Sequence, residues 1–234
     1  MKNKSVLVIS DMHIPYHHKD LLDFLKAIKR KFKPDRVICI GDEIDAHSFS
    51  MHQADPSLFS PGDEMKHAIH ELEKIYEIFP EVDVVESNHG SMAFRKQKAS
   101  GLPVHLFRSY SEILEAPNKW KWHKDLTIQL PNGEYCYFHH GKSAKLLSLS
   151  QSVGMSAVCG HFHESFCITH WAGPKALYFE MRVGCLIDNE SLAFAYNKNN
   201  TKKPIIGCGI IIDGQPKLIP MVLDKVGRWV RKIV

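Results

Sequence analysis

The chain has 234 residues, of which 44% are hydrophobic, and a formal net charge of +4. This length and apolar content suit one compact core, so we expect a single domain over residues 1–234. No run reaches the roughly 18 consecutive apolar residues of a membrane span, and the N-terminus has no signal-peptide cleavage pattern. We therefore expect a cytoplasmic protein that makes no use of a membrane.

The first part of the chain alternates predicted strands with predicted helices. Short apolar runs rich in β-branched residues predict buried strands at residues 6–10, 36–40 and 82–85. Apolar residues at helical spacing predict helices at residues 19–32 and about 63–79, the first of which ends before Pro34. Right-handed crossovers in such an α/β layout bring the carboxyl ends of the parallel strands to one edge of the sheet.

The second part of the chain changes character. Strand-like runs occur at residues 126–130, 135–138, 156–159, 177–183 and 205–212, and turn signals such as Asp213-Gly214 separate them. This pattern predicts a second, largely antiparallel sheet. We find no internal repeat and no Gly/Ser-rich linker that would favour an independent second domain.

Five short motifs carry the candidate chemistry, and each follows an apolar strand. They are Asp11-x-His13, Gly41-Asp42-x-x-Asp45, Asn88-His89, His139-His140-Gly141 and Gly160-His161-x-His163. Carboxylate and amide oxygens together with imidazole nitrogens suit a borderline divalent metal. The six cysteines lie mostly in apolar runs and never form Cys-x-x-Cys, which favours buried reduced thiols over a zinc ribbon or a disulfide scaffold. Two ions about 3.5–4 Å apart need a shared ligand, for which the Asp42 carboxylate is our candidate.

In this order, the motifs resemble those of the calcineurin-like metallophosphoesterase family, over residues 5–165. The resemblance implies a four-layer α/β/β/α sandwich of two mixed sheets flanked by helices. It also implies a dinuclear metal centre. One ion would be held by Asp11, His13, Asp42 and His163, and the other by Asp42, Asn88, His140 and His161. We expect manganese, although iron, zinc, nickel or magnesium would fit the same ligands.

The resemblance also implies roles in the hydrolysis of a phosphoester. The nucleophile would be a hydroxide that bridges the two metals. His89 would act as a catalytic residue that stabilises the phosphoryl oxygens or protonates the leaving group. Asp45 would orient a metal ligand from outside the metal shell. Two positions depart from the family pattern, because Ser87 replaces the usual glycine and Gly90 replaces an acidic residue that would follow His89.

Several histidines have more than one interpretation. Only one histidine of the pair His139-His140 should match the family's ligand, and we favour His140. His47 and His52 follow the second motif and could line the site, but surface or hydrogen-bonded structural roles are the stronger expectation for both.

The substrate is less well defined than the metal centre. Arg95 is a candidate phosphate contact in a basic stretch after the third motif, where simple surface solvation is an equal alternative. Residues 119–123, Lys-Trp-Lys-Trp-His, suit either stacking on nucleobases or alternation across a strand. The basic residues 225–232 could contact nucleic acid, a partner subunit or the flank of the domain itself, and we favour the flank.

Three functions remain open. The first is a phosphomonoesterase that acts on a nucleotide-like substrate, that is, a nucleotidase. The second is a phosphodiesterase or DNA nuclease of the repair-exonuclease kind, in which bases near Arg95 and Trp120 would form a strand path. The third is a non-catalytic binding protein that keeps the fold. The third is the weakest of the three, because the sequence contains His89 and the full set of candidate ligands.

Overall fold

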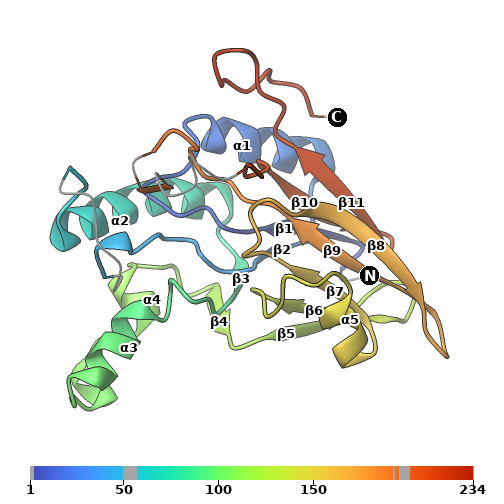
Figure 1. Ribbon diagram of the computed structural model, residues 1–234, viewed down its shortest axis with the longest axis horizontal. Helices are drawn as coiled ribbons and strands as arrows, with labels where there is room; N and C mark the ends of the chain where they lie inside the picture. The colour runs from blue at the N-terminus through green and yellow to red at the C-terminus, as the bar shows by residue number, and fades with distance from the viewer. Residues whose placement is uncertain (1–2, 50–56, 192, 195–200, 234) are drawn as a thin grey trace.

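The computed structural model describes residues 3–49, 57–191, 193–194 and 201–233; His52 lies outside these residues. Two β-sheets pack against each other, with helices on their outer faces (Figure 1). The arrangement is an α/β/β/α sandwich of two mixed sheets, which confirms the predicted fold class.

The first sheet has six strands in the order β11-β10-β1-β2-β3-β4. Strands β1 (Ser5–Ile9), β2 (Arg36–Cys39), β3 (Val82–Val85) and β4 (Trp120–His123) are parallel neighbours. Strands β10 (Gly207–Ile212) and β11 (Gln215–Pro220) extend the sheet beyond β1 in antiparallel pairings. Its helices are α1 (Leu21–Phe32), α2 (Pro61–Ile78), α3 (Met92–Ala99) and α4 (Tyr110–Ile113), with short 3₁₀ turns at His47–Phe49 and Val104–Leu106.

The second sheet has five strands in the order β5-β6-β7-β9-β8. They are β5 (Leu126–Gln129), β6 (Tyr135–His139), β7 (Ser156–Cys159), β8 (Phe166–Ala172) and β9 (Leu177–Val183). Strands β6, β7 and β9 are parallel, while β5 and β8 pair antiparallel at the two edges. Helix α5 (Ser148–Val153) lies between β6 and β7 in the chain and packs on the outer face of this sheet.

Two expectations about the second part of the chain were wrong. The sheet is mixed rather than largely antiparallel, because the crossover through α5 makes β6 and β7 parallel. The run at residues 205–212 belongs to the first sheet, where β10 pairs with β1. Ile210 and Ile211 of β10 point to opposite faces and are both fully buried, which requires a strand covered on both sides.

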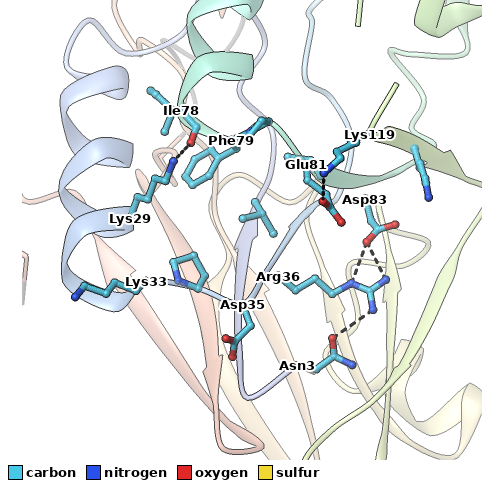
Figure 2. A pocket seen from close by; sticks show the side chains of 15 residues that line it. Asn3, Lys29, Lys33, Asp35, Arg36, Ile78, Phe79, Glu81, Asp83 and Lys119 are labelled. Carbon is cyan, nitrogen blue, oxygen red and sulfur yellow. Dashed lines mark hydrogen bonds and ion pairs between the residues drawn. The ribbon is translucent and has the colours of Figure 1, made fainter. Parts of the chain in front are cut away.

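A groove of about 1150 Å³ opens at the amino-terminal ends of β1 to β4, where Lys29, Arg36, Glu81 and Lys119 line it (Figure 2). Arg36 and Asp83 form a two-armed ion pair in this groove, with nitrogen–oxygen distances of 2.9 and 2.8 Å. The first three motifs follow the opposite, carboxyl-terminal ends of β1, β2 and β3, and the other two follow β6 and β7 of the second sheet. The groove and the first three motifs therefore lie at opposite ends of the strands of the first sheet.

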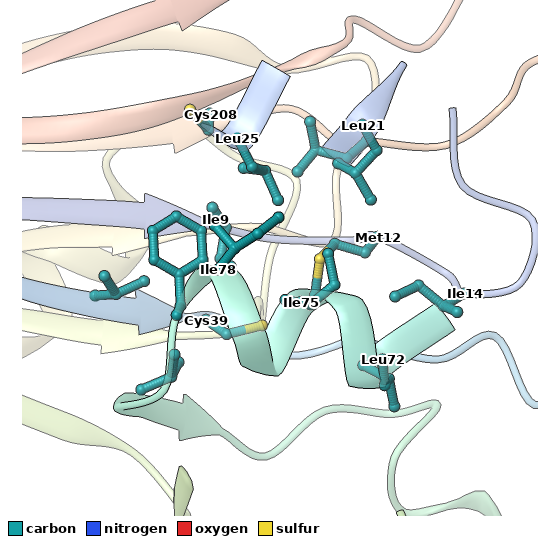
Figure 3. Packing of buried hydrophobic residues seen from close by; sticks show 14 of the residues in the cluster. Ile9, Met12, Ile14, Leu21, Leu25, Cys39, Leu72, Ile75, Ile78 and Cys208 are labelled. Atoms are coloured by element: carbon teal, nitrogen blue, oxygen red, sulfur yellow. The ribbon is translucent and has the colours of Figure 1, made fainter. Parts of the chain in front are cut away.

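Alternation along β1 explains how one strand serves two cores. Leu7 and Ile9 pack with the helices of the outer layer, and Figure 3 shows side chains of β1, β2, α1 and α2 meeting there, among them Ile9, Leu25 and Ile75. Val6 and Val8 point to the other face and pack against the second sheet. Successive residues of a strand face opposite sides, so an unbroken apolar run is needed where both sides are buried.

None of the helices in the described part of the chain is long and apolar enough to cross a membrane. All six cysteines are free thiols, and only Cys167 among them is not buried.

Candidate metal centre

The candidate residues lie in loops that follow parallel strands of both sheets, and the loops contact one another. The loop after β1 is hydrogen-bonded to the loop after β2, since Asp11 N–H donates to Gly41 O at 3.1 Å and His13 N–H donates to Asp42 O at 2.9 Å. The loop after β7 joins them, because His161 N–H donates to the Asp11 carboxylate at 2.9 Å.

Four candidate ligands have a left-handed backbone. They are Asp11 (φ 50°), His13 (φ 49°), Asp42 (φ 49°) and His161 (φ 68°). A positive φ is uncommon outside glycine, although Asp and His tolerate it better than most residues. Such conformations concentrate at functional sites, where the surrounding structure holds them.

Asp11, His13 and His163 form the first cluster, with ligand atoms within 4.8 Å of one another. His163 Nε2 lies 3.1 Å from Asp11 Oδ1 and 3.1 Å from His13 Nε2. Asp11 and His13 are buried. The three side chains thus aim their ligand atoms at one small volume.

Asp42, His140 and His161 form the second cluster by the same criterion. His140 Nε2 lies 3.1 Å from Asp42 Oδ2 and 3.2 Å from His161 Nδ1. The other nitrogen of His140, Nδ1, donates to Ile40 O at 2.8 Å, which directs Nε2 toward Asp42.

Asp42 lies between the two clusters. Its Oδ2 atom is 3.6 Å from His13 Nε2 of the first cluster and 3.9 Å from His89 Nε2. Asp42 therefore also belongs to a third group, with His13 and His89. This central position is the one that a bridging carboxylate requires.

The charges of the site suit cations. The buried carboxylates Asp11, Asp42 and Asp45 have no Lys or Arg ion pair in the described residues and pair with histidines alone. Asp45 Oδ2 is buried without a hydrogen-bond partner there. Uncompensated buried carboxylates are costly, and converging imidazole nitrogens with carboxylate oxygens are a suitable donor set for transition metals. The residues present therefore fit divalent metal ions.

The carboxylates and imidazoles shift one another's pKa values. Burial lowers the pKa of His13, but hydrogen bonds to Asp11 and Asp45 outweigh it and raise the pKa to about 10. For His140, burial is likewise outweighed by the charge of Asp42, and its pKa rises to about 9. Burial raises the pKa of Asp42, but the neighbouring His140 outweighs this effect and holds the pKa below its usual range. A metal would compete with the protons on these imidazoles.

Asp45 and His89 contact the clusters from the loops after β2 and β3. Asp45 Oδ1 is 2.6 Å from His13 Nδ1, so the aspartate orients that ring and leaves Nε2 for the cluster. His89 Nδ1 donates to the backbone carbonyl of Asp45, and the His89 N–H donates to Asp42 Oδ1 at 3.2 Å. A main-chain carbonyl thus takes the place of the acidic partner that Gly90 does not provide.

Ser87, the other departure from the family pattern, links two motif loops. Its Oγ accepts hydrogen bonds from Asp42 N–H at 3.0 Å and from Gly90 N–H at 3.2 Å. The hydroxyl therefore fixes the loop of Asp42 relative to the loop of His89.

The remaining candidates have different surroundings. His139 Nδ1 accepts from Gly141 N–H at 3.0 Å, and His139 belongs to none of the three candidate ligand groups in the described residues. Burial and then the charge of Lys142 lower the pKa of His139 to about 4. Asn88 is exposed; its backbone carbonyl accepts from Arg95 Nη2 at 2.8 Å. Arg95 therefore lies against the third motif loop. His47 Nδ1 lies 3.7 Å from Asp45 Oδ2.

The motifs did not identify two residues that contact candidate ligands and a third that contacts Phe162, which lies between His161 and His163. The Ser10 hydroxyl donates to Asp11 Oδ2. The buried Phe194 packs edge-on against His13, with ring centroids 5.5 Å apart, and Arg182 lies over the Phe162 ring at 4.8 Å. Phe194 and Arg182 are distant in sequence from the motifs they contact and have no local pattern that would indicate this role.

Residues 119–123 do not form a stacking surface. Trp120 is buried, and Trp122 packs against the same core. Lys119 and Lys121 line the groove at the far edge of the sheet. Alternation across β4 therefore explains this run, since Trp120 is buried while Lys119 and Lys121 line the far groove.

Comparison with solved structures identifies the fold. The chain superposes on the crystal structure of Chaetomium thermophilum Vps29 with a TM-score of 0.51 and 12% identity, covering 99% of this chain and 95% of that one. The structure of Vacuolar Protein Sorting 29 from Cryptosporidium parvum gives a TM-score of 0.45 and 15% identity over 93% and 96% of the two chains.

No protein-family model matches the sequence, and a search of curated proteins gives no match. The assignment therefore rests on the first of the two structures, a protein with the calcineurin-like metallophosphoesterase fold. The chain described here has the calcineurin-like metallophosphoesterase fold.

Proposed function

We propose that this protein is a phosphoesterase that depends on two divalent metal ions. The proposal rests on one observation: two Asp/His clusters converge, and histidines of both lie close to the Asp42 carboxylate. Asp11, His13, Asp42 and His163 would hold one ion, and Asp42, Asn88, His140 and His161 the other. Manganese suits this mixture of oxygen and nitrogen donors.

The chain's own residues would orient the ligands and handle the leaving group. When bound, the two ions would polarise the phosphoryl group and acidify the attacking water. Asp45 would hold the His13 ring, as its 2.6 Å contact supports. His89 is a candidate to stabilise the phosphoryl oxygens or to protonate the leaving group. Its Nδ1 faces the Asp45 carbonyl and its Nε2 faces Asp42, on the side of the clusters.

We propose a phosphomonoester of nucleotide-like chemistry as the substrate. Arg95 lies against the carbonyl of Asn88, where its guanidinium could also meet a phosphate. The burial of Trp120 removes one of the surfaces that a DNA strand path would need. The alternative is a phosphodiesterase or DNA nuclease, which would cleave a phosphodiester instead of a phosphomonoester.

We also propose a cytoplasmic location, in keeping with six cysteines that form no disulfide. The similarity to Vps29, named as a vacuolar sorting protein, keeps a non-catalytic binding role as the competing function. His89 favours the enzyme, because a binding protein would not need an imidazole there.

The test is turnover of p-nitrophenyl phosphate and its bis-ester by the metal-loaded protein, with manganese added after treatment with EDTA. Asp42→Asn and His89→Ala should each lower kcat by about 10²- to 10⁴-fold, the range for loss of an acid–base or ligand group. Asp83→Asn and His123→Ala are matched controls, because this pair has a 2.7 Å contact between β3 and β4 and neither residue belongs to the three candidate ligand groups. Both controls should retain the rate.

The outcomes separate the three functions. Preference for the monoester would support a nucleotidase, and a panel of nucleoside monophosphates would follow. Preference for the bis-ester would support the phosphodiesterase or nuclease. If the protein bound manganese but turned over none of these esters, nucleotides or DNA, the enzyme hypothesis would be overturned. The binding-protein hypothesis would then remain.

A further inference from the structure

A fully buried ion pair lies in the second sheet, next to the candidate metal centre. Glu180 and Arg182 of β9 are 1% and 2% exposed, and Arg182 Nη2 lies 3.1 Å from Glu180 Oε1. Charged side chains are seldom buried this completely unless their hydrogen bonds are satisfied by partners. Arg182 is paired in register with Cys159, the last residue of β7 before Gly160-His161. The pair is thus placed beside one of the ligand loops.

Arg182 holds the loop that follows His140. Its guanidinium donates to three consecutive backbone carbonyls, those of Ser143 at 3.2 Å, Ala144 at 3.0 Å and Lys145 at 2.8 Å. This planar group presents several donors in a fixed fork, which suits such a set of carbonyls. The conformation of residues 143–145 therefore depends directly on the position of one side chain.

Glu180 holds the far end of the same loop. Its carboxylate accepts from the N–H groups of Leu147, Leu149 and Ser150, at 3.0 to 3.1 Å. These N–H groups lie at the start of α5, where no residue of the helix's own sequence caps them. The two side chains together fix the whole segment from Ser143 to Ser150.

Arg182 also contacts the loop after β7. The guanidinium carbon lies 4.8 Å from the centre of the Phe162 ring, a cation–π contact. Phe162 stands between His161 and His163, and its ring packs edge-on against His161 at 5.0 Å. The two loops also touch, because a Cβ at Gly141 would come within 2.7 Å of the Cβ of His161.

We propose that Arg182 is a positioning residue that sets the relative placement of two metal-ligand loops, the one after His140 and the one that carries His161 and His163. The proposal rests on the proposed function, since it assigns these histidines to metal. Glu180 keeps the guanidinium in place through bonds from both Nε and Nη2. A buried ion pair often adds little to the net free energy of unfolding. The contacts of this pair with both loops therefore indicate that its role is to fix their relative positions.

The experiment compares manganese binding and loop mobility in four proteins. Manganese affinity is measured by isothermal titration calorimetry, and hydrogen exchange is measured for residues 141–147 and 160–164. The variants are Arg182→Lys, which keeps the charge but loses the fork, and the apolar double variant Glu180→Leu/Arg182→Met, which removes both buried charges. Arg36→Lys is the matched control, because Arg36 also forms a two-armed ion pair, with Asp83 in the far groove.

We expect both Arg182 variants to bind manganese about 10- to 100-fold more weakly than the wild type, the usual loss when an outer partner of a metal ligand is removed. Both segments should exchange faster, and Arg36→Lys should match the wild type in both measurements. Wild-type affinity and wild-type exchange in either folded Arg182 variant would overturn the proposal.

The failure of the proposed function would look different. If the wild type itself bound no manganese, the metal-dependent function would fail. The exchange of the two segments in Arg182→Lys would then still decide whether this side chain holds the loops.

Discussion

Histidine orientation in the candidate centre is set by the second nitrogen of each ring. His13 Nδ1 contacts Asp45 Oδ1, His140 Nδ1 contacts Ile40 O, and His89 Nδ1 contacts the Asp45 carbonyl. Each contact leaves Nε2 directed toward Asp42. Partners of this kind choose the tautomer and raise the basicity of a ligand imidazole.

Asp45→Ala removes the partner of His13. We expect manganese affinity, measured by titration calorimetry, to fall by about 10- to 100-fold, because the ring loses its fixed orientation. Asp45→Asn keeps an oxygen acceptor at the same place and should recover part of the loss. Equal affinities in the wild type and Asp45→Ala would show that the ring is oriented by other contacts.

Gly41→Ala tests the close approach of two motif loops. Gly41 has φ 80°, and a Cβ there would come within 2.4 Å of Ser87 Cβ. Gly133 has a similar φ of 85° but open space around it. We expect Gly133→Ala to cost about 1–2 kcal/mol of unfolding free energy from backbone strain alone. Gly41→Ala should cost more, since the clash adds to the strain, and equal urea midpoints for the two variants would contradict this.

At the scale of elements, the C-terminal segment docks on α1. Asp20, just before the helix, accepts from Arg228 Nε at 2.8 Å and from Trp229 N–H at 2.9 Å, and Trp229 packs against Phe24. The structure therefore supports the interpretation in which residues 225–232 contact the flank of the protein itself. The basic residues of this segment are in part neutralised by α1, as in the contact of Arg231 with Asp23 at 3.1 Å.

Asp20→Asn should loosen this segment in a pH-dependent way. Hydrogen bonds from Arg228 lower the pKa of Asp20, so its carboxylate stabilises the fold above its usual pKa, and this contribution is lost as the pH falls toward the lowered value. We expect a loss of about 1 kcal/mol at pH 6, because Arg228 is half exposed, and a smaller difference at pH 3. Urea unfolding of both proteins at the two pH values measures it. Asp23→Asn is the exposed control, and a difference that grew toward low pH would contradict the assignment.

Elements of strong periodicity were predicted closely, and weakly patterned ones were missed. The predicted runs at 36–40 and 177–183 match β2 and β9, because both strands are buried and uniformly apolar on their inward faces. Strand β8 was missed because its residues are mostly half-buried, and β11 because its two prolines argue against a strand. Proline is tolerated in β11 because this strand is at the edge of its sheet.

At the scale of the whole molecule, the two sheets share one core. Val8 and Ile38 of the first sheet pack with Phe138 and Met181 of the second. We therefore propose that residues 1–234 form a single domain, as the length of the chain suggests. Neither sheet would keep its inner face buried without the other.

Phe138→Ala tests this proposal. Phe138 is fully buried between the sheets, so its truncation should cost about 3–5 kcal/mol. The loss should appear in one cooperative transition, with coincident midpoints by circular dichroism and tryptophan fluorescence. Tyr135→Ala, on the same strand but 51% exposed, is the control and should change stability little. Two separate transitions would indicate two domains.

The sequence by itself determined the elements with strong local patterns and the order of the motifs, because strand alternation and helix spacing depend on neighbouring residues. The fold class followed from these motifs through the family resemblance. Only the tertiary structure decided which histidine of the pair enters the cluster, since this depends on the carbonyl of Ile40, a hundred residues from His140. It also placed β10 beside β1, Phe194 against His13 and Arg182 against Phe162. These contacts join distant parts of the chain through packing and hydrogen bonds, for which no local pattern exists.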